Sequence, residues 1–188
     1  VYWLGQDRQG RRQVFHALGH QPKVISTLAI DYQISKLTDL SDSFMFSYQQ
    51  LGHSFVVLTF PTDSVTFVYD STTSLWHTRA STINDEQERW RINTHSLFKG
   101  LHVVGDYSNG KLYLLKPDVY TEDGVEMVAV RTSAAIRNKQ TRITVDEVHI
   151  MTEPGVGLIT GDAEDITPMG LFSWSRDGGR TFSAEVDT

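Results

Sequence analysis

The residues of this chain that could ligate a metal are its histidines and two acidic segments. Of the seven histidines, only His16 and His20 are close in sequence. A spacing of four aligns two ligands only on a helix, and this segment is predicted to be a strand that leads into a turn. The acidic segments Gly161–Asp165 and Thr121–Gly124 lack the alternating acidic spacing of a calcium loop. We therefore predict ordinary histidines, solvated acidic loops, no metal and no cofactor.

Residues for nucleophilic catalysis are also missing from the sequence. The chain contains no cysteine and no Gly-x-Ser-x-Gly elbow. Gly155 and Gly157 lack the further glycine and the helical context of a dinucleotide-binding loop. The prediction is that this chain is not an enzyme.

Another kind of local chemistry, hydrogen bonding within a turn, is concentrated near the C-terminal end. The segment contains, in order, Ser175, Asp177, Gly178, Gly179, Thr181 and Phe182. Serine and aspartate oxygens accept hydrogen bonds from turn amides, and glycine adopts positive φ without strain. We predict a hairpin between strands at Phe172–Ser175 and Thr181–Phe182, with Phe182 buried beneath it.

The order Ser-x-Asp-x-Gly-x-Thr-aromatic resembles the Asp-box, a hairpin signature found mostly in β-propellers, sialidases among them. Sialidases also carry an Arg-Ile-Pro element. The nearest matches here are Arg142-Ile143-Thr144 and Arg91-Ile92-Asn93, which lack the proline. The box lies away from the catalytic centre in those enzymes, so its residues are predicted to be structural. A sialidase-like glycosidase is the weaker alternative.

Tryptophans could form a platform for a glycan. The candidates are Trp3, Trp76, Trp90 and Trp174. For Trp76 and Trp174, which lie beside turns, packing in the core is the favoured interpretation. A glycan-binding propeller remains an alternative function.

Composition narrows the class of protein. The 188 residues are 39% apolar and 11% aromatic, as expected for a globular chain. The formal net charge of -6 argues against broad or sequence-specific nucleic-acid binding. No apolar run approaches the roughly 18 residues of a membrane span. The chain begins within strand-like sequence at Val1 and not at a methionine, and it stops at Thr188 just after the hairpin, so we expect a piece of a longer protein.

Most segments have the pattern of strands. Alternating or apolar runs predict strands at Val1–Leu4, Gln13–Leu18, Phe44–Tyr48, Ser54–Phe60, Ser64–Asp70, Leu101–Gly105, Lys111–Leu115 and Arg142–Ile150. The segment Ser26–Leu37 suits either a helix or a strand. Asn84–Trp90 is predicted to be a loop with one helical turn.

Similar turns recur between these strands. They are Asp7–Gly10, Asp70–Ser74, Asp106–Gly110 and Asp177–Gly179. Short strands in meander order predict an all-β fold, a β-propeller or a fragment of one, with a β-sandwich as the alternative. Residues 1–188 are predicted to form a single domain of about three to four blades, at roughly 40–50 residues a blade.

Five stretches resemble, in order, the packaged-DNA stabilisation or tail hub proteins of short-tailed, P22-like phages. They are Trp3–Gly10 with Gly19–Thr27, Phe55–Pro61, Tyr69–His77, Gly105–Tyr113 with Tyr120–Gly124, and Trp174–Phe182. The resemblance implies a propeller-like structural protein in the virion tail, made in the cytoplasm of the bacterial host. Its implied partners are the portal–adaptor complex, tail appendages and further copies of the full-length protein. It implies no catalytic residues.

Overall fold

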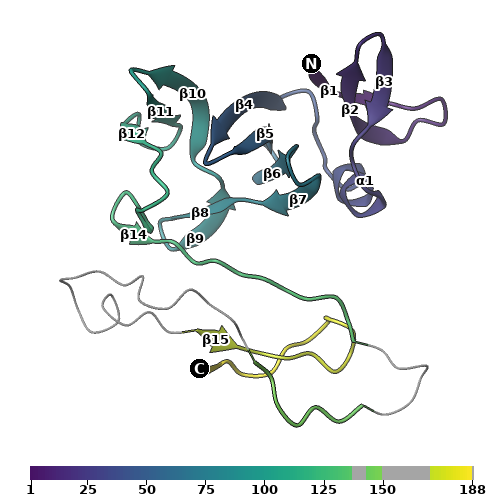
Figure 1. The fold of residues 1–188 in the computed structure, drawn as a ribbon, viewed down its shortest axis with the longest axis vertical. Coiled ribbons are helices and arrows are strands. Elements are labelled where there is room, and N and C mark those ends of the chain that lie inside the picture. Colours follow the sequence, from purple (N-terminus) through teal and green to yellow (C-terminus); the bar gives the residue numbers. More distant parts are fainter. Residues whose placement is uncertain (137–142, 150–169, 188) are drawn as a thin grey trace. The chain divides into compact units, whose positions relative to one another are not determined.

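The computed structural model describes residues 1–136, 143–149 and 170–187. The chain divides into two compact units, Val1–Val128 and Ala129–Thr188 (Figure 1). Antiparallel strands make up most of the first unit, and the prediction of an all-β fold is confirmed. The prediction of one domain over residues 1–188 stays a prediction. In the parts of the chain that the structure describes, no helix is long and apolar enough to cross a membrane.

Two meander sheets form the N-terminal half of the first unit. The first sheet has the order β1 (Tyr2–Gln6), β2 (Arg12–Leu18) and β3 (Gln21–Val24). The central sheet has the order β4 (Phe44–Gln50), β5 (His53–Phe60), β6 (Val65–Asp70) and β7 (Leu75–Thr78). A four-stranded meander in sequence order is the usual form of a propeller blade.

The rest of the first unit consists of two hairpins and a third meander. The hairpins are β8 (Ala80–Ile83) with β9 (Glu86–Arg89), and β13 (Thr121–Glu122) with β14 (Val125–Glu126). The third meander has the order β10 (Ile92–Phe98), β11 (Leu101–Asp106) and β12 (Leu112–Leu114).

One helix, α1 (Leu28–Ser35), connects the first two sheets. Thr27 caps its start, because the threonine hydroxyl accepts a hydrogen bond from the Ile30 amide at 3.4 Å. Ile30 and Ile34, one turn apart, are both buried. Of the two structures that the sequence allowed for Ser26–Leu37, the helix therefore forms, because this spacing puts both isoleucines on one face.

Apolar side chains cover the central sheet on both faces. Leu58, Phe60 and Phe67 point to one side, where they pack in a cluster with Val14 of β2 and with the two buried isoleucines of α1. Side chains alternate along a strand, so the neighbouring residues Val57 and Val68 point to the opposite side.

The second apolar cluster lies on this opposite face. Val57 and Val68 pack there with Tyr48 of β4 and with Trp90, Ile92 and Val104 from the third meander and the residues before it. The central sheet is thus enclosed between its neighbours in sequence (Figure 1). Sheets that stack face to face in chain order are the arrangement of propeller blades.

Outside the Asp-box-like turn, two predictions of local structure were wrong. Asn84–Trp90 is not a loop with a helical turn: Asn84 and Asp85, with φ of 52° and 64°, form the tight turn of the β8–β9 hairpin. Two successive residues with positive φ are what a two-residue hairpin turn requires. Of the strand predicted at Arg142–Ile150, residues 143–149 are not in a strand, and both ends lie outside the described residues.

The second unit contains one short pair of strands, β15 (Leu171–Phe172) and β16 (Val186–Asp187). The strand predicted at Phe172–Ser175 thus ends at Phe172. The chain does not resume a strand at Thr181–Phe182 as predicted, but at Val186. The Asp-box-like turn is therefore a wider loop between the two strands than a tight hairpin would be.

Candidate functional site

The sequence-predicted turn of the second unit is organised around the Asp177 carboxylate. Its Oδ1 accepts hydrogen bonds from the amides of Arg180 and Thr181, both at 2.9 Å, and its Oδ2 accepts one from the Thr181 hydroxyl at 2.6 Å. The Ser175 hydroxyl donates to Asp177 at 2.8 Å and accepts from the Gly179 amide at 2.8 Å. Hydrogen bonds from Thr181 and Ser175 hold the pKa of Asp177 well below its usual range.

Glycine is required at two positions of this turn, since Gly178 and Gly179 have φ of 80° and 90°. The aromatic side chain after the turn does not behave as predicted. Phe182 is 50% exposed, so the expectation that it would be buried was wrong. The physical reason is that the described part of this unit has only two short strands and no sheet beneath the turn. The turn is held by its own polar contacts.

Three other turns share a different hydrogen-bonding pattern. In each, an aspartate that ends or follows a strand accepts, through Oδ1, a hydrogen bond from the amide two residues later. The distances are 2.8 Å for Asp7, 2.9 Å for Asp70 and 2.6 Å for Asp106. Asp177 bonds the amides three and four residues later. Asp7 combines the two patterns, because its Oδ1 also accepts from the Arg11 amide at 2.8 Å. The four turns that looked alike in sequence therefore differ in their hydrogen bonds.

A buried arginine joins the β13–β14 hairpin to the third meander. The Arg91 guanidinium is close to three carboxylates: Asp106 at 3.4 Å, Glu122 at 3.6 Å and Asp123 at 3.9 Å. Glu122 also accepts a hydrogen bond from the Trp90 indole at 3.0 Å. Buried charges need such partners, so this network fixes the β13–β14 hairpin against the third meander. It was missed in the sequence, where Arg91 stood out only as an imperfect match to Arg-Ile-Pro.

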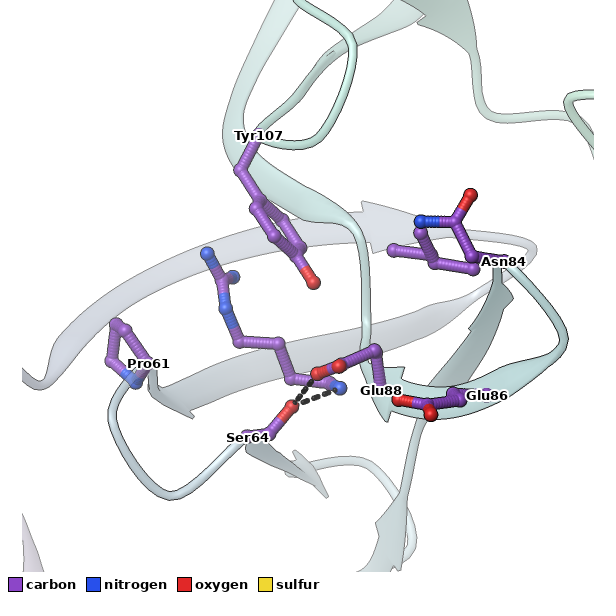
Figure 2. Close-up of a pocket in the computed structure, with 8 residues that line it drawn as sticks. Pro61, Ser64, Asn84, Glu86, Glu88 and Tyr107 are labelled. Carbon is purple, nitrogen blue, oxygen red and sulfur yellow. Dashed lines mark hydrogen bonds between the residues drawn. The ribbon is translucent and has the colours of Figure 1, made fainter.

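An open surface pocket of about 420 Å³ lies in the first unit. Its lining consists of Pro61, Ser64, Ile83, Asn84, Glu86, Glu88, Arg89 and Tyr107 (Figure 2). These residues come from the β5–β6 turn, the β8–β9 hairpin and the turn after β11.

Polar contacts fix part of this lining. The Ser64 hydroxyl donates to Glu88 and accepts from the Arg89 amide at 2.9 Å (Figure 2). The Arg89 guanidinium stacks on the Tyr107 ring, 3.6 Å from its centroid. Burial lowers the pKa of Arg89, against the opposing influence of Tyr107 and nearby carboxylates. In the sequence, the polar run Glu86-Gln87-Glu88-Arg89 is the signal that could have pointed to this site.

The four tryptophans have different surroundings. The Trp76 indole donates to the Ile25 carbonyl at 3.0 Å and packs against the first cluster, as predicted. Trp90 is buried, and Trp3 stacks on Phe15 with the ring centroids 5.6 Å apart. Trp174, in the second unit, is 43% exposed. The expectation that Trp174 packs in the core was therefore wrong, for the same reason as for Phe182.

The two histidines that were candidates for a metal site lie in different environments. His16 stacks on Tyr2 with a centroid distance of 4.3 Å, and His20 is exposed in the turn before β3. Within the residues that the structure describes, no group of three or more histidine or acidic side chains is arranged to hold a metal. The acidic residues Asp162, Glu164 and Asp165 lie outside the described residues.

The first unit also matches a known protein family. A protein-family model described as "Bacteriophage P22 Gp10, beta-propeller" matches residues 1–120. The matched region includes the first sheet, α1, the central sheet and the third meander. No curated protein matches the chain.

Proposed function

Because the chain belongs to the Bacteriophage P22 Gp10 family of beta-propellers, we propose that it is a tail hub or accessory factor that stabilises packaged DNA. It is a phage structural protein, and its location is the virion. In the proposed role it connects the portal–adaptor complex to tail appendages, assembles with further copies of the full-length protein, and has no catalytic residues.

The observation that carries this proposal is the family match over residues 1–120. The fold supports it physically. A sheet with tightly packed side chains on both faces is stiff, because protein interiors are close-packed and resist compression. A part of the virion that holds DNA under pressure needs such stiffness.

The surface of the third meander supports contacts with protein. Phe98 is paired with Leu101, and Leu114 with Val103, so these side chains share one face of the sheet. Phe98, Leu101, Leu112 and Leu114 are all exposed there. Contiguous exposed apolar surface is typical of protein-binding faces. The net charge of -6 is unfavourable for direct binding to the DNA backbone, which is also negatively charged.

Deletion of the gene in its phage or prophage tests the proposal. We expect particles that package DNA but fail to keep it, so that the amount of nuclease-protected DNA per particle falls. A complementing copy of the full-length gene should restore retention. If particles without the protein hold their DNA as well as complemented ones, the proposed role is wrong.

A further inference from the structure

We propose that the contact between the third meander and the central sheet is a pH-sensitive switch, which loosens when His95 and His102 are both protonated. The inference concerns the first unit alone and does not depend on the role in DNA retention. His95 lies on β10 and His102 on β11. Figure 1 shows β10 beside β4 of the central sheet. The histidine pair therefore lies where the two sheets meet.

A direct hydrogen bond joins the two imidazole rings. His95 Nε2 and His102 Nδ1 are 2.8 Å apart, and both residues are half-buried. The bond needs one nitrogen that carries a hydrogen and one that does not. When both imidazoles are protonated, both nitrogens carry hydrogens. The bond is then lost, and two positive charges face each other at close range.

Aromatic rings of the central sheet pack against the histidine pair. His95 stacks on Phe46 with the ring centroids 6.1 Å apart, and its centroid lies 5.4 Å from that of Tyr48. His102 meets the Tyr48 ring edge-on at 5.9 Å. Burial lowers the pKa of His95, and the neighbouring His102 lowers it further. Because Phe46 and Tyr48 belong to β4, movement of the pair would disturb the contact between the sheets.

The other titratable groups on the facing sides of the two sheets give the pair no free counter-ion. They are Tyr48, His53, Asp70, His77, Arg79 and Tyr113. Asp70, the carboxylate of this set, already contacts the His53 imidazole at 2.7 Å. Arg79 is positively charged, and burial together with Arg79 lowers the pKa of His77. Protonation of the pair thus adds positive charge to a contact that already contains an arginine.

The direction of the effect follows from the pKa of His95. This pKa is lower in the folded chain than the ordinary value of about 6.5. The unfolded chain therefore binds more protons as the solution becomes acidic, so stability falls with the pH. The contact is unaffected above about pH 7 and weakens between about pH 6.5 and 5. Aspartate and glutamate ordinarily titrate near pH 4, so a change in this range comes from histidines.

Hydrogen exchange of the backbone amides of β10 and β11 tests the switch in the full 188-residue chain. We expect the opening equilibrium, corrected for intrinsic exchange, to rise about tenfold between about pH 7.5 and 5, as for a difference of one pKa unit. His95→Gln and His102→Asn keep a polar atom near the bonded nitrogen but cannot be protonated, so each should abolish most of the rise. His20→Gln is the matched control, because His20 is exposed in the turn before β3.

An opening equilibrium that stays the same at both pH values would overturn the proposal. A rise that persists in both His95→Gln and His102→Asn would overturn it too, because the protonated pair would not be the cause. The amides of β2, in the first sheet, provide a second measurement. An equal rise there would indicate general unfolding in acid instead of loosening of this contact. Fast exchange of β2 at pH 7.5 would identify a misfolded variant, and the other variant then decides.

Discussion

Single aspartates organise the turns of this protein through hydrogen bonds that span four residues or fewer. Asp70, which ends β6, shows how strongly such contacts act. Burial works to raise its pKa, but hydrogen bonds from Thr73, His53 and Thr72 outweigh this effect and hold the pKa below its usual range. At Asp177 hydrogen bonds also lower the pKa, and there every partner lies within four residues, whereas His53 is 17 residues from Asp70. Turn chemistry of this kind can be recognised from sequence alone.

The titration of Asp177 provides a test at this scale. Its pKa is lower in the folded chain than the ordinary value of about 3.9. The carboxylate therefore stabilises the turn above about pH 4, and this contribution is lost as the pH falls through the folded pKa. NMR of the carboxyl carbon should show a midpoint below that of a free aspartate.

Substitution of the hydrogen-bond donor separates this effect from general acid sensitivity. Thr181→Val should move the Asp177 midpoint towards the ordinary value, because the hydroxyl donor is removed. Ser183→Ala is the control, since the Ser183 hydroxyl accepts from the Trp174 amide and does not contact Asp177. An unchanged midpoint in Thr181→Val would contradict the assignment of the shift to this hydrogen bond.

At the scale of the element, the backbone conformation of turns decides where strands end. Residues with positive φ lie at the β8–β9 turn and in the Asp177 loop. The latter uses glycine and was recognised. The former uses Asn84 and Asp85, and it was mistaken for a loop because its strands are short and polar. Polar residues carry little information on whether a segment forms a strand, although β8 and β9 pair with each other directly across this turn.

A pair of substitutions at Gly178 tests the requirement for positive φ. Gly178→Val should destabilise the loop by about 1 kcal/mol or more, because a β-branched residue is strained at this φ. Gly178→Asn should cost less, since asparagine tolerates the left-handed region better. Hydrogen exchange of the Thr181 amide reports the free energy of local opening. Equal exchange rates in both variants would argue against a backbone cause.

At the scale of the whole molecule, the central sheet is the element on which the first unit depends. It contributes to both apolar clusters, one shared with β2 and α1 and the other with the third meander. A sheet that packs against neighbouring elements on both faces is the feature that this all-β fold shares with the blades of a propeller. The two units of the chain differ in this respect, because the second has only the β15–β16 pair among its described strands.

Two phenylalanines in the first unit form a matched comparison. Phe67 is 1% exposed in the first cluster, and Phe98 is 60% exposed on the third meander. Phe67→Ala should lower the free energy of unfolding by about 3–5 kcal/mol, because it leaves a cavity. Phe98→Ala should change it by no more than about 0.5 kcal/mol. Chemical denaturation measures both, and similar losses would show that the central sheet does not carry the stability of the unit.

The sequence by itself determined the strand-rich fold class, the N-terminal strands and the polar contacts of the Asp177 turn. These features depend on residues within a few positions of one another, or on an alternation that one strand displays alone. Only the tertiary structure decided that Phe182 and Trp174 stay exposed, that Arg91 is clamped by three carboxylates, and that Pro61, Glu86 and Tyr107 line one cavity. Burial and cavities arise where segments distant in sequence meet, and no local pattern specifies that meeting.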